Sequence, residues 1–387
     1  MKARHSTAAV AVVAAAALGL GLVASKKLRR KLLGRKRKPT GRKAILVAGG
    51  AGYIGSHTTL LLLEAGYDVY VMDNLINSCI EGINRVRKLT GAGPDQLVFF
   101  NVDLCAAGAL RNALADCPPF DACIHFAGLK AVGESVQKPI LYYENNLIST
   151  LNLLKELNET TCRKFVFSSS ATVYGTAEAP ITESSSVGTG ITNPYGRTKF
   201  MIEEILKDFC KSPDGSTWLV ECLRYFNPTG AHPSGEIGED PNGIPNNLMP
   251  YVSQVAVGKR PHVNVFGDDY NTKDGTGVRD YIHVMDLGAG HISALNYLDK
   301  EGPGWYTHNL GTGTGYSVLE MVAAMGKACS KELKYEIQGR RPGDLAVVYA
   351  DPSKAANDLG WRAEKGLDEM VTDLWAWQSK NPNGFNC

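Results

Sequence analysis

The sequence lacks the cysteine pattern of a small protein held together by disulfides. Its nine cysteines are an odd number, and none of them forms a C-x-x-C pair. This usage fits a reducing compartment and argues against a disulfide framework. Apolar content and glycine number are ordinary for a globular enzyme, and 387 residues suffice for one large core or two linked ones.

Acidic residues are missing from the first 43 positions. That segment contains thirteen Lys or Arg residues and no Asp or Glu, so the net charge of +2 hides an asymmetry. The remaining chain carries 28 basic and 39 acidic residues, a net charge of −11. A folded body this acidic is a poor candidate for nucleic-acid binding.

A candidate membrane segment is present, but it is short. Residues 8–24 form an uncharged, alanine-rich run of seventeen residues, close to the lower limit for crossing a bilayer. Basic residues cluster after it, whereas a cleaved secretory signal carries its charge before the apolar run. We interpret residues 1–43 as an N-terminal anchor with a basic linker, which leaves the catalytic body in the cytoplasm. A disordered tail or an organelle-targeting segment is the alternative.

The sequence has no fixed-period repeat, and short apolar strands alternate with helical stretches between residues 44 and 224. After the strand at 45–47, strands are expected at Asp68–Met72, Leu97–Phe100, Ala122–Phe126, Phe165–Phe167 and Trp218–Leu223. This alternation predicts an α/β fold with a doubly wound parallel (Rossmann) sheet over residues 44–224. Loops rich in Pro, Gly and Asn follow at 227–245, and residues 225–387 are expected to form mainly a smaller substrate-binding domain. A final helix is expected after Gly366.

A glycine-rich turn follows the first strand. Gly49, Gly52 and Gly55 are spaced by three, and a helical pattern begins directly after them. A strand that turns at glycine into a helix lets backbone N–H groups approach a pyrophosphate. The second strand ends at Asp73, where a carboxylate can meet the ribose hydroxyls of a dinucleotide. No Arg or Lys follows Asp73 directly, which favours NAD over NADP, and an Asp in an ordinary turn is the alternative reading.

The segment 193–199 places a tyrosine and a lysine together. Asn193 and Pro194 predict a helix start, so Tyr195 and Lys199 lie one turn apart on the same face. A nearby ammonium and the helix N-terminus both lower the pKa of a phenol, which makes Tyr195 a candidate general base. Three serines, 168–170, follow an expected strand at the edge of the sheet where ligands bind. One of their hydroxyls can hydrogen-bond the substrate oxygen that loses its proton.

These motifs together resemble the extended short-chain dehydrogenase/reductase superfamily, and longer strings narrow the likeness to the UDP-glucose (UDP-galactose) 4-epimerases. The strings are GGAGYIGSHT from Gly49, DNLINS from Asp73, HFAGLKAVGESVQKP from His125, SSSATVYG from Ser168, NPYGRTK from Asn193, LRYFNPTGAHPSG from Leu223, GIPNNLMPYV from Gly243, DGTGVRDYIHVMDL from Asp274 and RRPGD from Arg340. The likeness runs from about Lys43 to the C-terminus. The run 311–315 looks like a second glycine loop, but it precedes a capping box at Ser317 and Glu320 and predicts only a helix start.

The resemblance implies bound NAD, a set of ligand contacts and a homodimer, and it implies no metal. The implied cofactor contacts are Gly49, Gly52, Tyr53, Ile54, Gly55, Asp73, Asn74, Asn77, Ser78, Asp103, Leu104, Phe126, Ala127, Lys130, Asn145, Ser168, Tyr195 and Lys199. The implied contacts to the UDP-sugar are Ser170, Tyr195, Asn227, Asn246, Asn247, Leu248, Phe266, Arg279, Arg341, Asp344 and Val348. In this family the residue at the position of Val348 faces the 2-substituent of the sugar.

The resemblance also implies a mechanism in which Tyr195 is the base, Ser170 its hydrogen-bonding partner and Lys199 the ligand of the nicotinamide ribose. Hydride leaves C4 of the sugar and returns to the other face of a 4-keto intermediate, which interconverts UDP-glucose and UDP-galactose. A 4,6-dehydratase needs a further acid or base near the serines, and residues 169–174 hold no carboxylate. Another UDP-sugar epimerase, for N-acetylhexosamines or pentoses, and a non-catalytic membrane-tethered NAD-binding protein are the remaining alternatives.

Overall fold

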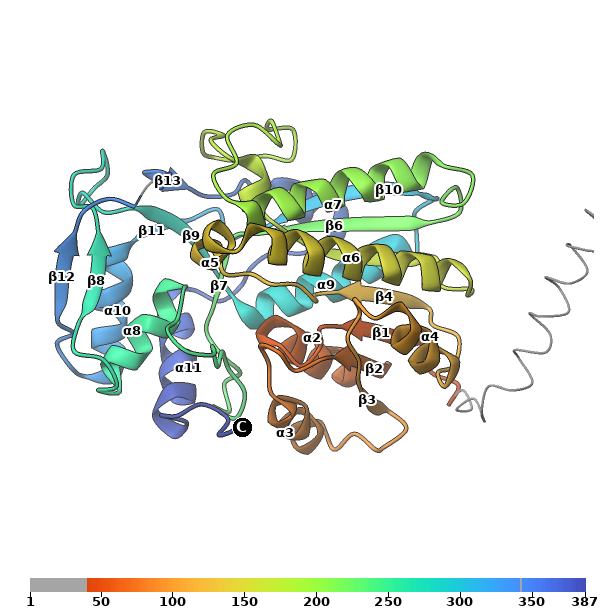
Figure 1. Cartoon of the computed structure of the whole chain (residues 1–387). Coiled ribbons are helices and arrows are strands. Elements are labelled where there is room, and N and C mark those ends of the chain that lie inside the picture. Colours follow the sequence, from red (N-terminus) through yellow and green to blue (C-terminus); the bar gives the residue numbers. More distant parts are fainter. Residues whose placement is uncertain (1–39, 342) are drawn as a thin grey trace, which may run out of the picture.

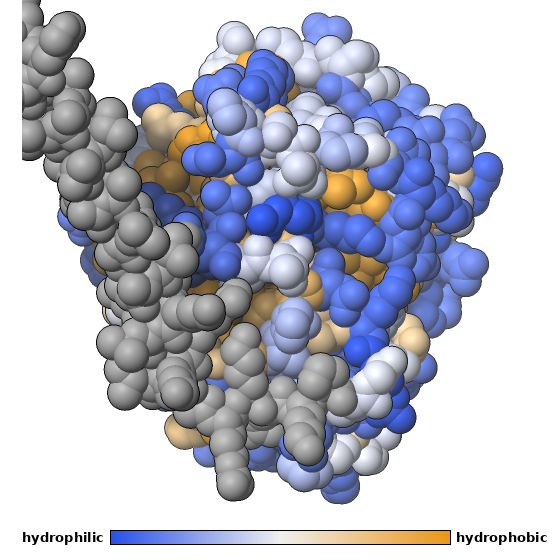
Figure 2. All heavy atoms as spheres, turned by 90° about the vertical axis from the view of Figure 1, so that its right-hand side faces the viewer, coloured by the Kyte–Doolittle hydropathy of each residue, from blue (hydrophilic) through white to orange (hydrophobic). Residues whose placement is uncertain are grey.

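The computed structural model describes residues 40–341 and 343–387. The predicted membrane segment at residues 8–24 lies outside these described residues, as does most of the basic linker. Within the described part of the chain, no helix is both long enough and apolar enough to cross a membrane. The side of the molecule in Figure 2 is mostly hydrophilic, with hydrophobic residues confined to separate small areas.

Seven strands form the central sheet, and all neighbouring strands are parallel. They are β1 (Ala44–Ala48), β2 (Asp68–Asp73), β3 (Leu97–Asn101), β4 (Ala122–His125), β5 (Lys164–Ser170), β6 (Leu219–Tyr225) and β10 (Gly304–Leu310). Their order in the sheet is β10-β6-β5-β4-β1-β2-β3. The predicted doubly wound parallel sheet is confirmed, and the expected strand bounds differ from the observed ones by at most a few residues.

Helices cover both faces of this sheet (Figure 1). One layer contains α2 (Tyr53–Glu64), α3 (Ile80–Thr90) and α9 (Val284–Leu298), and the other contains α4 (Ala107–Ala115), α6 (Pro139–Asn158) and α7 (Pro194–Lys211). Alternate residues of β1 serve the two layers, because Ile45 and Val47 pack in the first core and Leu46 and Ala48 in the second. A strand buried on both faces therefore reads as a continuous apolar run.

The remaining elements gather beside one end of the central sheet (Figure 1). A small sheet contains β7 (Asn227–Thr229), β9 (Val278–His283), β11 (Gly315–Ser317) and β13 (Val347–Val348), and β8 (Val263–Phe266) pairs with β12 (Tyr335–Gln338). The helical elements there are α5 (Val132–Gln137), η1 (Ala171–Tyr174), α8 (Leu248–Ala256), α10 (Val318–Cys329), η2 (Ala355–Leu359) and α11 (Leu367–Lys380). The chain thus leaves the central sheet after β6 and returns to it with α9 and β10. The predicted domain boundary at residues 224 and 225 stays a prediction.

Local signals set where several helices begin. The side chain of Asn193 caps α7 by accepting a hydrogen bond from the backbone N–H of Gly196 at 2.8 Å, with Pro194 as the first helical residue. Ser317 and Glu320 form the predicted capping box of α10, so the glycine run before it is a helix start. Helix α11 begins at Leu367, directly after Gly366, as expected.

One disulfide joins Cys79, which caps α3, to Cys387 at the C-terminus. The other seven cysteines form no disulfide, so there is no disulfide framework, but this single pair was not anticipated from the cysteine count and spacing. The two partners are 308 residues apart, and such a separation leaves no local signal. The same tail is held by Asp240, whose carboxylate accepts from the backbone N–H of Phe385 at 2.8 Å, and by Arg85, which lies 5.1 Å from the Phe385 ring centroid.

Candidate active site

A single large cavity of about 1080 Å³ lies between the carboxyl ends of the central strands and the smaller sheet. Every cofactor and substrate residue expected from the sequence lines it, from the glycine turn at one end to Arg341 and Val348 at the other. These residues are spread over about three hundred positions of the sequence. The parallel topology brings them together, because all the strands of such a sheet end at the same edge. Among residues 40–341 and 343–387, no group of His, Cys, Asp and Glu side chains is arranged to hold a metal ion.

The glycine turn is tightly packed and leaves backbone donors open. Gly49 has a φ of +82°, and a Cβ there would lie 2.4 Å from the backbone nitrogen of Ala127. A Cβ on Gly55 would lie 2.4 Å from the carbonyl oxygen of Gly49, so both positions require glycine. Gly52 caps α2 without a side-chain hydrogen bond. The N–H groups of the first helical turn are therefore available to an anionic ligand.

Asp73 is fixed at the end of β2, beside the glycine turn. One carboxylate oxygen accepts from the backbone N–H of Ala51 at 3.0 Å, and the other accepts from Leu75 N–H and the Ser78 hydroxyl, both at 2.9 Å. The carboxylate organises the loop after β2, as an Asp in a turn does. Because the side chain also lines the cavity, the turn reading and the ribose-contact reading are compatible.

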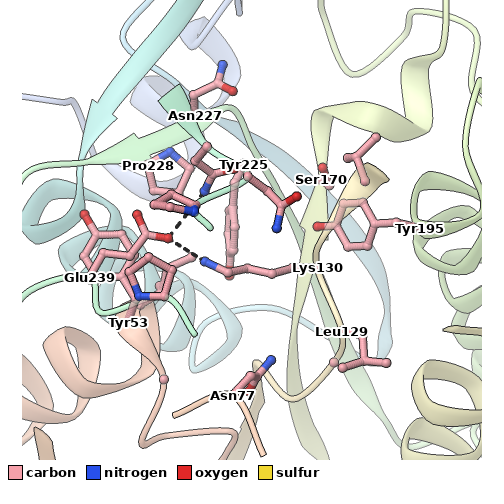
Figure 3. Close-up of a pocket in the computed structure, with 18 of the residues that line it drawn as sticks. Tyr53, Asn77, Leu129, Lys130, Ser170, Tyr195, Tyr225, Asn227, Pro228 and Glu239 are labelled. Carbon is pink, nitrogen blue, oxygen red and sulfur yellow. Dashed lines mark hydrogen bonds and ion pairs between the residues drawn. The ribbon is translucent and has the colours of Figure 1, made fainter. Parts of the chain in front are cut away.

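Tyr195 and Ser170 lie at the opposite side of the cavity from Tyr53 (Figure 3). Lys199 also lines the cavity. Tyr195 hydrogen-bonds to Ser170, whose hydroxyl also accepts from Thr172 Oγ1 at 3.0 Å. The Lys199 ammonium donates to the carbonyl of Ser168 at 2.5 Å and lies 5.9 Å from the Tyr195 ring centroid. The expected one-turn spacing on α7 is confirmed.

The expected lowering of the Tyr195 pKa is wrong. Burial raises the pKa of Tyr195, because the phenolate loses its hydration, and the hydrogen bond from Ser170 opposes this only in part. Burial also lowers the pKa of Lys199 to about 7, partly offset by the charge of Glu203. An ammonium with so low a pKa is only partly charged near neutrality, so its help to the phenolate is smaller than the sequence suggested.

Two arginines converge at the far end of the cavity. Arg279 on β9 and Arg341 both bond the carboxylate of Asp344, at 2.9 and 2.8 Å respectively. The Arg341 guanidinium also lies 5.0 Å from the Phe266 ring centroid. Val348 on β13 pairs with Arg279 in the parallel register of β9 and β13. A carboxylate that orients two guanidinium groups suits a pocket for a diphosphate.

The sequence reading missed many of the lining residues, among them Glu239 and Tyr225. Glu239 meets Lys130 across the cavity, with Nζ and Oε1 2.7 Å apart, and Tyr225 extends into the same space (Figure 3). Tyr225 hydrogen-bonds to Ser168 and His291. The acidic pair 239–240 inside a loop of Pro, Gly and Asn was the available signal for Glu239. Tyr225 reads as an ordinary strand residue, and nothing in its sequence context distinguishes it.

The fold and these groups define a class. A Rossmann sheet with an uncapped glycine turn, and a Tyr/Lys pair on one helix beside a serine-bearing strand, make an extended short-chain dehydrogenase/reductase. A family model described as GDP-mannose 4,6 dehydratase matches residues 46–374.

Comparison with individual relatives identifies a family within this class. UDP-glucose 4-epimerase 2 of Arabidopsis thaliana is 58% identical over 345 residues, which cover 89% of this chain and 97% of that one. The human UDP-glucose 4-epimerase is 56% identical over 348 residues, 88% of this chain and 98% of its own. The crystal structure of the Bifidobacterium longum UDP-glucose 4-epimerase, in complex with NAD+ and UDP, superposes with a TM-score of 0.84 at 51% identity and covers 88% of this chain and all of that chain. The chain belongs to the family that the matched model describes and, within it, to the UDP-glucose 4-epimerases.

Proposed function

We propose that this chain interconverts UDP-glucose and UDP-galactose at C4 of the sugar, with NAD as a hydride carrier that stays in place. The observation that carries the proposal is the shared cavity, in which the Tyr195–Ser170 pair and the glycine turn line one space. The relatives at 56–58% identity bear the name of this activity, and the superposed Bifidobacterium longum structure holds NAD+ and UDP.

The residues present fit a dinucleotide. The first turn of α2, directly after the glycine turn, offers backbone N–H groups to a pyrophosphate, and the buried carboxylate of Asp73 lies beside it at the end of β2. We assign cofactor contacts to the residues that the resemblance names, from Gly49 through Lys199, because each lines the cavity. When bound there, NAD would supply reversible hydride transfer at C4 of the sugar.

The chain's own groups handle the proton. Tyr195 takes it from the 4-hydroxyl and gives it back after the sugar has turned over, while Ser170 shares a hydrogen bond with the phenol. The protonated form of Lys199 favours the phenolate, and its bond to the Ser168 carbonyl fixes its position. Arg279 and Arg341 bind the diphosphate of the nucleotide, since their guanidinium groups face the cavity and can pair with phosphate oxygens.

A 4,6-dehydratase is the competing activity, because the matched family model carries that description. Residues 169–174 next to the Tyr195 hydroxyl offer serine, alanine, threonine, valine and tyrosine, with no carboxylate. Elimination of water from C5 and C6 needs an acid and a base there. The epimerase assignment is therefore the one that the residues favour.

The proposal also covers the oligomeric state and the location of the protein. Helices α6 and α7 pack together and expose Ile140, Leu141, Ile148 and Met201, and this apolar face suits a homodimer. Residues 1–43 are proposed to anchor the body at a membrane through the apolar run at residues 8–24, which leaves the catalytic part in the cytoplasm.

The test is an assay of residues 40–387 on UDP-glucose, with Tyr195→Phe as the variant. Wild type is expected to form UDP-galactose, and the variant to lose about 10²–10⁴-fold in kcat, as the loss of a general base does. NAD content should stay the same in both, because the glycine turn holds the cofactor. Normal turnover by Tyr195→Phe would contradict the mechanism, and protein that neither carries nor binds NAD would contradict the function.

A further inference from the structure

Glu239 has a buried carboxylate whose position inside the cavity is fixed by its neighbours. Its side chain is only 5% exposed, and its backbone carbonyl accepts from Trp377 Nε1 at 3.1 Å. A Cβ on the preceding Gly238 would lie 2.3 Å from the Trp377 ring, so the segment rests directly on α11. A buried charge needs a partner, and the structure supplies two donors to the same oxygen: Lys130 Nζ at 2.7 Å and Asn247 Nδ2 at 3.4 Å.

Lys130 comes from the other wall of the cavity. Its loop follows β4 and packs on the glycine turn, where the Ala127 nitrogen would meet a Cβ on Gly49. The Lys130 side chain is 51% exposed, and its ammonium lies 5.9 Å from the ring centroid of Tyr53, which follows the last residue of the turn. The Lys130–Glu239 pair therefore spans the cavity beside the glycine turn, as Figure 3 shows.

We propose that Glu239 is a positioning residue, which holds the Lys130 ammonium across the mouth of the cofactor site and so slows the release of NAD. This proposal rests on the proposed function, since it concerns the same cofactor. A lysine with half its side chain exposed samples many rotamers unless a partner fixes it. With Glu239 in place, the ammonium stays beside the donors that receive a pyrophosphate and adds its positive charge there. The pair also ties the loop after β4 to the segment seated on α11, which closes one side of the site.

The place of the Lys130–Glu239 pair suits an enzyme that binds both a dinucleotide and a nucleotide sugar. The cavity takes two anionic diphosphates, one in the cofactor and one in the nucleotide sugar. A free ammonium would pair with either of them, whereas one bonded to Glu239 keeps its place on the cofactor side. Loss of Glu239 is therefore expected to affect cofactor retention more than the KM for UDP-glucose.

The experiment uses the full-length holoprotein and the single variants Glu239→Gln and Lys130→Met, with the double variant. Gln keeps the size of Glu and can still accept from Asn247, so the fold should be retained. The measurement is the rate of NAD release, followed as loss of bound nucleotide after dilution. Each single variant is expected to release NAD about tenfold faster than wild type, and the double variant no faster than the singles, because all three lack the same pair.

Glu236→Gln is the matched control, since it removes a carboxylate from the same segment without touching the Lys130 pair. It should release NAD at the wild-type rate. Melting temperatures for all variants separate a general loss of stability from loss of the pair. Wild type that retains NAD together with unchanged release in Glu239→Gln would overturn the proposal, and so would additive effects in the double variant. Wild type that binds no NAD would instead overturn the proposed function.

Discussion

The side chain of Lys199 is buried. Its ammonium donates to the Ser168 carbonyl and lies 4.8 Å from the Phe167 ring centroid, and burial lowers its pKa to about 7 from the ordinary 10.5. The folded protein therefore binds fewer protons than the unfolded chain between about pH 7 and 10.5. Stability rises with pH wherever the unfolded state binds more protons.

We expect Lys199 to cause a measurable pH dependence of the free energy of unfolding. In protein freed of nucleotide, Lys199 should raise the free energy of unfolding with pH between 7 and 9, by up to about 1.4 kcal/mol per pH unit. Lys199→Met removes the titrating group, so that part of the slope should vanish. Urea unfolding of both proteins at pH 7, 8 and 9 gives the comparison. Parallel pH dependences in the two proteins would show that Lys199 is not the group responsible.

We predict that Val348 limits the room around the 2-substituent of the sugar. It lines the cavity on β13 next to Arg279, and it is smaller than tyrosine and larger than cysteine. We expect UDP-glucose and UDP-galactose as main substrates, with UDP-N-acetylglucosamine accepted weakly. Val348→Tyr should remove the side activity and spare the main one, because the 2-hydroxyl still fits. A steric clash in such a pocket is worth about 1–3 kcal/mol, roughly ten- to two-hundredfold in kcat/KM.

The measurement is kcat/KM of the wild type and of Val348→Tyr, for UDP-glucose and UDP-galactose and for the N-acetylated pair of UDP-sugars. No N-acetyl activity in wild type, or its survival in Val348→Tyr, would show that another residue limits the pocket at this point.

For single residues, the sequence predicts local geometry well, but it predicts the electrostatic surroundings that set a pKa poorly. The Tyr195–Lys199 spacing depends on one helix turn and the Asn193 cap, which are local and were predicted. The pKa of Tyr195 depends on how much of the fold covers it, and the predicted direction was wrong. Glu239 was missed because its seat on Trp377 and its partner Lys130 are both far from it in the sequence.

Among the elements, the strands between residues 44 and 224 were predicted because buried parallel strands leave apolar runs, and the start of α7 was predicted because Asn193 and Pro194 mark it. Strand β5 is longer than expected, since Ser168, Ser169 and Ser170 continue the parallel pairing with β6. Polar residues at a strand end carry no apolar signal, so the periodic pattern ends before the strand does. The return of the chain through β10 to the central sheet has no local signature either, because pairing of β10 with β6 is set by the whole topology.

The C-terminal tail is an element whose attachment can be tested. Cys387 bonds Cys79 at the cap of α3, while Asp240 and Arg85 hold the same tail without covalent bonds. We expect oxidised wild type to be more stable than Cys387→Ser by about 2–4 kcal/mol, as a disulfide across a long loop stabilises. Thermal unfolding with and without dithiothreitol measures the difference. The reductant should lower the melting temperature of wild type alone, and an equal effect on both proteins would locate the sensitivity elsewhere.

For the whole molecule, the described residues just before β1 show how the N-terminal side of the chain meets the body. Lys43 pairs with Asp299 at 2.6 Å, and Arg42 lies 3.7 Å from Asp68, so these two basic residues belong to the body rather than to the linker. We expect removal of residues 1–39 to leave kcat and KM unchanged and to move the protein from the membrane fraction to the soluble fraction. Cell fractionation and one assay on both forms measure this. Equal distribution of the two forms would refute the anchor, and lost activity would refute dispensability.

The placement of β10 has a consequence for synthesis on the ribosome. Strand β6 is complete once residue 225 has emerged, yet its neighbour on the open side is β10, which spans Gly304–Leu310. While residues 226–303 are being translated, the nascent sheet ends at β6 with a row of unpaired backbone groups, and such edges pair readily with other chains. Until β10 emerges, the edge of β6 is therefore expected to be open to pairing with other chains, so a product released within this interval is expected to aggregate more readily than the complete chain.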